Sequence, residues 1–188
     1  MAVADRKGRE RAEREHRIIA TARSIAEAEG WSAVTIRRLA EGVEYSQPVL
    51  YSHFENRDAI VAAVAVEGFG EIAIALHRAA HGSTDRGTAL RQVAATYLAF
   101  AREHPAVYEA MFSMRIDLRF AETDTKSELK DGFAALMAVV APSSGDAEIA
   151  TETFWAALHG LAELERSGRI RPSARSERIA FLCGLIER

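Results

Sequence analysis

The stretch TIRRLAEGVEYSQPVLYSHF, residues 35–54, decides how the N-terminal part of this 188-residue chain folds. Thr35 and Ser46 are favoured helix N-cap residues, and each precedes a short segment with apolar residues at helical spacing. We therefore predict two short helices, one from Thr35 to about Gly42 and one from Ser46 to about Phe54, joined by a tight turn. Such a pair forms a helix-turn-helix when the first helix braces the second and the second presents a small, polar outer face.

The second helix of this pair has an apolar side and a polar side. Leu50 and Phe54 lie four residues apart, so we expect them to face the core. The first helix contributes its own inward residues, Ile36, Leu39 and Ala40. Four side chains can point outward from the second helix: Gln47, Val49, Ser52 and His53.

The outward residue types suit DNA. Gln47 can donate to and accept from a base edge in the major groove, and Val49 can contact a thymine methyl group. Hydroxyl, imidazole and guanidinium groups suit phosphate contacts, which fix register without reading sequence; here they belong to Thr35, Ser46, Tyr51, His53 and Arg57. The set expected at a DNA interface is Thr35, Arg37, Ser46, Gln47, Pro48, Val49, Tyr51, Ser52, His53 and Arg57.

The composition limits the other classes of protein to which the chain could belong. Hydrophobic residues make up 48% of the chain and charged residues 27%, which suits one large or two small packed domains. No apolar run approaches the roughly 20 residues that span a bilayer, and the charged N-terminus lacks the apolar core of a secretory signal. A single cysteine excludes an internal disulfide framework. We expect a soluble, cytoplasmic protein without a membrane partner.

The net charge of -3 argues against a general nucleic-acid coat, but the charge is uneven. Residues 1–57 hold ten Lys and Arg against nine Asp and Glu, whereas residues 58–188 hold 14 against 18. The first 23 residues hold seven against four. This mild asymmetry permits DNA binding at the N-terminal end.

The rest of the chain also has helical periodicity, and no segment alternates apolar and polar residues as a strand would. We predict an all-α fold, with a DNA-binding domain over residues 1–57 and a helical ligand-binding and dimerisation domain over residues 58–188. Long helices are expected from about Arg9 to Glu29, from Asn56 to about Gly82 and from Ala147 to about Ser167. Residues 115–130 are polar and charged and are expected to form a loop and a helix start.

The N-terminal pattern resembles the TetR family of bacterial transcriptional regulators over about residues 10–66. That family typically shows T-x-x-x-I-A, a turn, S-x-x-x-L-Y-x-H/Y-F, and then a polar residue and Lys or Arg that open a long fourth helix. This chain supplies those positions in register: Thr35, Leu39-Ala40, Ser46, Leu50-Tyr51, His53-Phe54 and Arg57. It departs from the family in the turn, where Glu44 and Tyr45 replace the usual Gly and Val. Either the turn has a different backbone, which Gly42 could help to form, or Glu44 is strained.

The C-terminal part resembles a TetR subgroup with a Trp-His-Gly signature, on the segments YLAFAREHPAVYEAMF (97–112) and FWAALHGLAELE (154–165). Trp155, His159 and Gly160 stand at the signature positions. The resemblance implies a site for a small apolar or amphipathic ligand among the later helices. The candidate lining residues are Phe69, Ile72, Tyr97, Phe100, Tyr108, Met111, Phe112, Phe133, Met137, Trp155 and His159. For each of them, ordinary core packing is the alternative.

The chain contains no convincing constellation for catalysis, so we expect neither an enzyme nor a cofactor. His77 and His81 are four residues apart, but no glutamate lies between them and the helix end there is expected to be solvated, so we expect no metal site. The favoured hypothesis is a homodimeric repressor that a small molecule releases from a roughly palindromic DNA operator. The alternative is a small-molecule-binding helical protein whose helix-turn-helix no longer functions.

Overall fold

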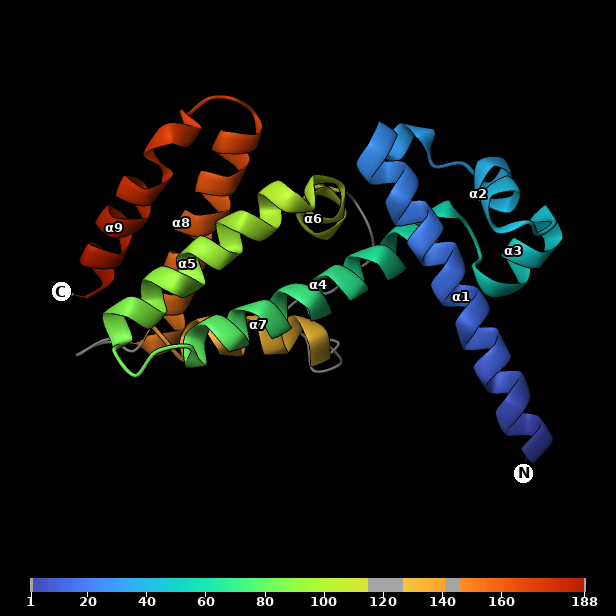
Figure 1. Ribbon diagram of the computed structural model, residues 1–188, viewed down its shortest axis with the longest axis horizontal. Coiled ribbons are helices and arrows are strands. Elements are labelled where there is room, and N and C mark those ends of the chain that lie inside the picture. Colours follow the sequence, from blue (N-terminus) through green and yellow to red (C-terminus); the bar gives the residue numbers. More distant parts are fainter. Residues whose placement is uncertain (1, 115–126, 141–145, 188) are drawn as a thin grey trace. The chain divides into compact units, whose positions relative to one another are not determined.

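The computed structural model describes residues 2–114, 127–140 and 146–187, and within these ranges the chain is helical, with no strand (Figure 1). The predicted all-α fold is confirmed. The N-terminal elements are α1 (Ala2–Glu29), a 3-10 turn (Trp31–Ala33), α2 (Ile36–Val43), α3 (Gln47–His53) and α4 (Arg57–His81). They are followed by α5 (Arg86–Glu103), α6 (Pro105–Phe112), α7 (Ser127–Met137), α8 (Ala147–Arg166), a second 3-10 turn (Pro172–Ala174) and α9 (Arg175–Ile186).

Helix starts follow the expected capping chemistry. The Thr35 hydroxyl oxygen accepts a hydrogen bond from the Arg38 N–H at 3.2 Å at the start of α2. The Asn56 side-chain oxygen accepts one from the Ala59 N–H at 2.9 Å at the start of α4. Ser46 precedes α3 as expected, but its side chain makes no capping bond. The predicted start of α1, at about Arg9, lies about seven residues after the observed start. Of the loop and helix start expected over residues 115–130, residues 115–126 lie outside the described residues, and α7 begins at Ser127.

The chain forms two compact units. The first unit comprises residues 1–68 and 106–118, and the second comprises residues 69–105 and 119–188. Helix α4 passes from the first unit into the second, and the boundary between α5 and α6 returns the chain to the first. The compact units part within α4, between Gly68 and Phe69, and a functional domain boundary between residues 57 and 58 stays a prediction.

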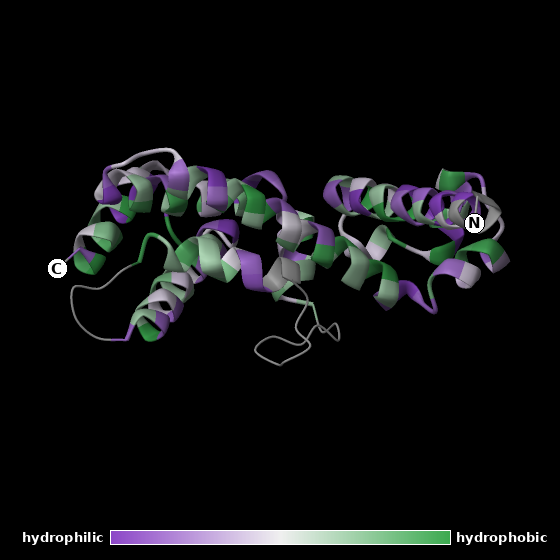
Figure 2. Ribbon diagram, turned by 90° about the horizontal axis from the view of Figure 1, so that it is seen from below, coloured by the Kyte–Doolittle hydropathy of each residue, from purple (hydrophilic) through white to green (hydrophobic). Residues whose placement is uncertain are grey.

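The core of the first unit is built from the inner sides of its helices. Ile18 of α1, Leu39 of α2 and Leu50 of α3 are fully buried, as the apolar spacing predicted. Gly68 of α4 lies against Val107 and Met111 of α6 so closely that no side chain would fit between them. Figure 2 shows hydrophobic and hydrophilic residues alternating along these helices, which is the pattern of surface helices with one buried face.

In the second unit, α5 contacts both α8 and α9, and α7 contacts α8. Its core contains Tyr97 from α5, Phe154 and Leu158 from α8, and Cys183 from α9, all buried. Burial raises the pKa of the Cys183 thiol to about 11, so this side chain acts as a small apolar residue. The Glu165 carboxylate of α8 pairs with Arg175 and Arg178, which ties the two last helices together.

Of the described helices, α4 alone is long and apolar enough to cross a membrane, judged by length and composition only. Glu67 and Glu71 interrupt its apolar sequence, so it is no continuous apolar run. The expectation that no segment approaches the length of a membrane span was too broad for this helix. Half of its most apolar window is buried inside the protein, as in a core helix.

Candidate nucleic-acid interface and candidate ligand core

Helices α2 and α3 form the predicted helix-turn-helix. Leu39 and Ala40 on α2 and Leu50 on α3 are buried between the helices of the first unit. Because these residues hold α3 from its inner side, the opposite side of α3 is left free to meet another molecule. A helix-turn-helix requires this arrangement, in which the bracing helix holds the inner side of the recognition helix and the outer side stays free for DNA.

The outer side of α3 presents polar groups to solvent. Gln47, Pro48 and Ser52 are exposed, and the Tyr51 side chain is 53% exposed. No intramolecular hydrogen bond engages the side chain of Gln47 or Tyr51 within the described residues, so the amide and the phenol remain available. Val49 is half-buried, and the Ser52 hydroxyl donates a hydrogen bond to the Val49 carbonyl oxygen at 2.7 Å.

Two predicted contact residues point inward instead. The His53 side chain is only 5% exposed, and its Nδ1 lies 3.1 Å from Glu15 Oε1 on α1. The Arg57 guanidinium donates hydrogen bonds to the carbonyl oxygens of Val34, at 2.8 Å, and Trp31, at 2.6 Å. The expectation that His53 points outward was therefore wrong. The structure uses both side chains to hold α3 and the start of α4 against the rest of the first unit.

The remaining predicted residues lie near the start of each helix. Thr35 is exposed, although its hydroxyl oxygen caps α2. Arg37 is exposed and pairs with Glu41, Nε to Oε1 at 2.9 Å. A pair this exposed to water contributes little to stability, so the guanidinium can exchange its partner for a phosphate at low cost. Ser46 is exposed directly before α3.

The turn between α2 and α3 is formed by one residue with a left-handed backbone conformation. Glu44 has φ 58° and ψ 37°, and among the described residues other than glycine it alone has positive φ. Its N–H donates to the carbonyl oxygens of Ala40 and Glu41, and the Tyr45 N–H donates to Ala40 at 2.9 Å. This is the hydrogen-bonding of a helix C-terminus that usually takes glycine. Gly42 has a different role: a Cβ there would approach Thr21 Cγ2 of α1 to 2.8 Å.

We expect Glu44→Gly to stabilise the protein by about 1 kcal/mol, because glycine adopts this backbone without the steric cost that a Cβ carries. Glu44→Ala is the matched control, since it removes the carboxylate but keeps the Cβ, and its stability should stay within about 0.5 kcal/mol of the wild type. Urea unfolding of the three proteins measures the difference. Equal stabilisation by both variants would assign the effect to the charge and not to the backbone.

Several contacts on α1 were not predicted from the sequence. Arg38 of α2 pairs with Glu29 of α1, Nη1 to Oε2 at 2.7 Å, and this hydrogen bond lowers the pKa of Glu29. The Arg17 guanidinium of α1 lies 5.2 Å from the centre of the Tyr45 ring in the turn, within the range of a cation–π contact. Glu29 and Arg38 are 9 positions apart, and Arg17 and Tyr45 are 28 positions apart, so no helical spacing signals either contact.

Helix α6 is tied to the end of α1 and to the 3-10 turn that follows it by three hydrogen bonds. The two carboxylate oxygens of Glu27 accept from the N–H groups of Ala106 and Val107, each at 3.1 Å. The Trp31 indole N–H donates to the Ala106 carbonyl oxygen at 2.8 Å in a buried contact. A carboxylate satisfies the free N–H groups of a helix start and favours its dipole. These bonds hold the first turn of α6 against the helices that brace α3.

The predicted ligand residues fall into both units. Tyr108, Met111 and Phe112 belong to α6 in the first unit, where the Tyr108 and Phe112 rings lie 4.7 Å apart. The second unit brings together Tyr97, Trp155 and Phe133: the Trp155 indole N–H donates to the Tyr97 hydroxyl oxygen at 3.0 Å, and the Phe133 and Trp155 rings meet edge to face at 6.4 Å.

The other candidates in the second unit vary in burial. Phe69, Ile72 and Phe100 are buried, whereas Met137 is exposed. His159 is half-buried on α8, one turn after Trp155, and burial lowers the pKa of its imidazole. Its neutral form is therefore favoured, and a neutral imidazole can both donate and accept a hydrogen bond.

Metal-binding groups do not cluster in the described ranges, where no three or more His, Cys, Asp or Glu side chains come together to hold an ion. The His77 and His81 rings stack at 4.3 Å, and His81 Nδ1 lies 2.8 Å from the His77 carbonyl oxygen. That the protein uses no metal or cofactor stays a prediction.

Known protein families match the N-terminal and the C-terminal parts of the chain. Residues 18–64 match the family described as bacterial regulatory proteins, tetR family, and residues 90–182 match the tetracyclin repressor-like C-terminal domain. Together these matches cover well over half of the chain. An uncharacterized HTH-type transcriptional regulator of Mycobacterium tuberculosis is 29% identical over 154 residues, which are 80% of this chain and 69% of that protein.

Solved structures share the fold. A protein of unknown function from Rhodococcus sp. RHA1 has a TM-score of 0.74 at 22% identity, and the match covers 92% of each chain. The structure of RolR in complex with resorcinol has a TM-score of 0.67 at 16% identity, covering 95% of this chain and 90% of that one. With two family matches in chain order and a helix-turn-helix at the place they require, the chain belongs to the TetR family of bacterial helix-turn-helix transcriptional regulators.

Proposed function

We propose that this protein is a homodimeric repressor that binds a roughly palindromic DNA operator and is released from it by a small molecule. The observation that carries the DNA-binding role is the exposed polar side of α3, held in place by the buried Leu39 and Leu50 beneath it. The proposal includes no catalytic activity, and it places the protein in the cytoplasm, where the chromosome is accessible.

The roles of the individual DNA contacts follow from exposure and chemistry. Gln47 and Val49, with Pro48 beside them, are proposed to meet base edges in the major groove. Phosphate contacts are assigned to the exposed residues Thr35, Arg37, Ser46, Tyr51 and Ser52. His53 and Arg57 are proposed to act indirectly, by positioning α3 through the hydrogen bonds described above.

Two substitutions separate these roles. Gln47→Ala should relax the base preference at the positions that Gln47 reads, at a cost of about 1–3 kcal/mol on the preferred duplex only. Tyr51→Phe removes one hydroxyl from a phosphate contact, so it should weaken binding to all sequences alike, by roughly three- to ten-fold. Affinity measurements on a preferred duplex and on its single-base variants distinguish the two patterns. Identical patterns for both variants would show that the contacts are assigned wrongly.

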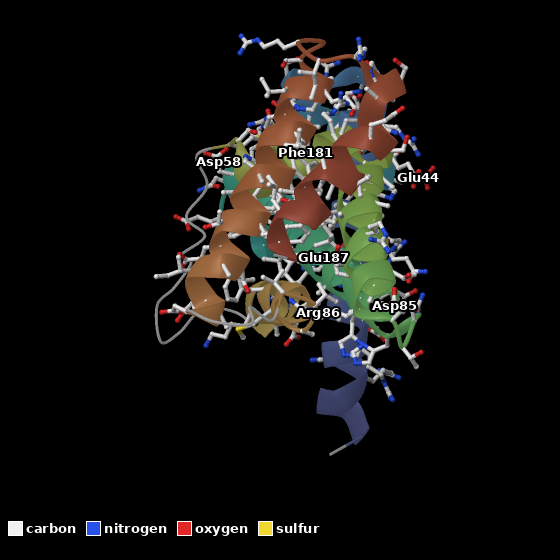
Figure 3. All side chains as sticks on the ribbon, turned by 90° about the vertical axis from the view of Figure 1, so that its left-hand side faces the viewer. Glu44, Asp58, Asp85, Arg86, Phe181 and Glu187 are labelled. Carbon is white, nitrogen blue, oxygen red and sulfur yellow. The ribbon has the colours of Figure 1, made fainter. Side chains whose placement is uncertain are left out.

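Dimerisation is proposed to occur through α8 and α9. Leu164, Phe181 and Leu185 are large apolar side chains that remain exposed, and Phe181, on the outer side of α9 in Figure 3, is 72% exposed. A two-fold pair of these helices would bury that surface and present two copies of α3, which requires an operator of two related half-sites.

The ligand is proposed to bind near the Tyr97–Trp155 pair of the second unit. A buried phenol and a half-buried indole among aromatic residues combine apolar surface with a few oriented polar groups, which is the usual composition of a small-molecule site. His159, Phe133, Phe100 and Phe69 extend this set. RolR, which shares the fold, was crystallised with resorcinol, a small aromatic ligand with polar groups. We infer a ligand of this general kind, apolar or amphipathic, for the present chain.

The response to ligand is proposed to pass through α6. Helix α5 contributes Tyr97 to the second unit, and α6, which begins at Pro105, carries the chain into the first unit from Ala106 on. Glu27 and Trp31 hold the first turn of α6. A shift of α5 on ligand binding would therefore move α6 and, through it, α1, which packs against α3. The proposed ligand site and the DNA interface would be coupled through this one connection.

One selection experiment tests the proposal. The full-length protein is incubated with a pool of random duplexes, bound DNA is amplified over several rounds, and the enriched sequences are read. We expect a motif of two inverted half-sites, with binding that weakens steeply as salt rises. No enrichment, together with no retention on heparin, would favour the alternative of a helical ligand-binding protein with a non-functional helix-turn-helix.

A further inference from the structure

The N-terminal half of α1 packs against little of the first unit. Among the described side chains of α1, from Arg6 on, the first buried one is Ile18, and every side chain from Arg6 to Arg14 is exposed. Figure 1 shows this half of α1 continuing past α2 and α3. A helical segment of this length has little stability of its own in water and is held as a continuation of the packed half. Such an extension is available to bind something outside the first unit.

The cations of the extension fall on two opposite sides. At roughly 100° per residue, Lys7 and Arg14 lie within about 60° of Arg11 around the helix axis, whereas Arg6 and Arg9 lie on the far side. We call Lys7, Arg11 and Arg14 the basic stripe. Arg6 pairs with Glu10 at 3.5 Å, but no ion pair engages Lys7 or Arg14 among the side chains that the structure describes. The stripe therefore carries two cations without a protein partner.

Arg11 shows where the stripe faces. Its Nη2 donates a hydrogen bond to the Ser52 carbonyl oxygen in the last turn of α3, at 3.3 Å, and its Nε donates to Glu15 Oε1 at 2.8 Å. The same Glu15 oxygen lies 3.1 Å from His53 Nδ1. This cluster fixes the face that carries the basic stripe against the C-terminal end of α3. Arg11 of the stripe thus adjoins Ser52, an exposed residue of the proposed DNA interface.

We propose that the basic stripe is an additional DNA-binding element, in which Lys7 and Arg14 bind backbone phosphates beside the groove that α3 enters. Arg11 is a positioning residue, because its guanidinium holds the extension to α3. The rise from Lys7 to Arg14 is about 10 Å, long enough to reach more than one phosphate of a strand. The occupant is duplex DNA because the stripe is cationic and adjoins α3, so this inference rests on the proposed function. Phosphate contacts carry no sequence information, so the stripe adds affinity without base preference.

A pair of double variants with equal charge change tests the proposal. Lys7→Ala/Arg14→Ala removes two cations from the stripe, and Arg6→Ala/Arg9→Ala removes two from the opposite side of the same helix. Alanine preserves the helix, and circular dichroism and thermal unfolding check that both proteins fold as the wild type does. Fluorescence anisotropy is then measured over a salt series, with a duplex enriched from the random pool and with a scrambled duplex of the same length.

We expect the stripe variant to bind both duplexes at least about ten-fold more weakly at low salt than the wild type does. Its plot of log affinity against log salt should be less steep by about 0.9 for each lost phosphate contact. The opposite-side variant should stay within about two-fold of the wild type. The ratio of the two affinities, which measures base preference, should be unchanged in both variants.

Three results would overturn the inference while leaving the proposed function intact. Equal losses in the two double variants would show a general effect of net charge, and wild-type affinity in the stripe variant would show that the stripe does not touch DNA. Loss of binding to vesicles of anionic phospholipid, with DNA affinity intact, would assign the stripe to a membrane surface. A wild-type protein that binds neither duplex at any salt would overturn the proposed function and this inference together, so the two failures are distinguishable.

Discussion

Gly68→Ala should destabilise the protein by about 1–3 kcal/mol and lower its melting temperature by several degrees. A Cβ on Gly68 would overlap Val107 Cγ1 and come within 2.8 Å of Met111 Sδ. The methionine can rotate away, but Val107 is fully buried and its short, branched side chain is stiff, so α6 itself must move away from α4. The cost should exceed the gain of up to about 1 kcal/mol that alanine brings to a helix interior.

Gly132→Ala is the matched control for this prediction. Gly132 is also a helical glycine, in α7, but a Cβ there would meet only the Ala73 Cβ at 4.0 Å, which is an ordinary contact. Its substitution should leave stability unchanged or raise it by up to about 1 kcal/mol. Thermal and urea unfolding of both variants measure the effect. A Gly68→Ala protein as stable as Gly132→Ala would mean that α4 and α6 are not packed as closely as the structure has them.

Glu27→Gln should loosen the first turn of α6 from the end of α1 while leaving the DNA-binding face intact. The carboxylate accepts one hydrogen bond on each oxygen, whereas the amide has one oxygen and places an NH₂ group against a backbone N–H. Loss of a charged hydrogen bond and an unpaired N–H should cost about 1–3 kcal/mol. Amide hydrogen exchange at Ala106 and Val107 should accelerate by at least about ten-fold, because local opening becomes easier.

We expect Glu27→Gln to uncouple ligand binding from release of the DNA. A small molecule that releases the wild-type protein from DNA should bind the variant but release it poorly, because α6 no longer pulls on α1. Glu13→Gln is the control, since Glu13 is an exposed glutamate on the same helix, and it should behave as the wild type. If amide exchange in α6 is unchanged in Glu27→Gln, or if release by the small molecule stays normal, α6 is not the connection that carries the response.

Local chemistry made the helix-turn-helix predictable. Thr35 and Asn56 cap their helices because their short side chains reach the free N–H groups nearby in sequence, and Leu39 and Leu50 are buried because their spacing places them on one face. The departure at Glu44 correctly located a backbone constraint. The sequence could not assign the role of Gly42, which depends on Thr21 of another helix.

Contacts between distant parts of the chain were not predictable in the same way. Glu27 and Ala106 are 79 residues apart, and a lone glutamate near the end of a helix has no local signal that it will cap a later one. His53 follows a pattern that permits an outward direction, yet Glu15 on α1 draws it inward. The Trp155–Tyr97 hydrogen bond likewise joins residues from two helices, so either residue alone is consistent with ordinary core packing.

The proposed function requires that the exposed side of α3 reads DNA sequence. The most direct measurement is the affinity of the full-length protein for a duplex enriched from a random pool and for a scrambled duplex of equal length, at one near-physiological salt concentration. We expect the enriched duplex to bind at least about 1,000-fold more tightly, and Gln47→Ala to reduce this ratio. Equal, weak affinity for the two duplexes, unchanged by Gln47→Ala, would contradict it.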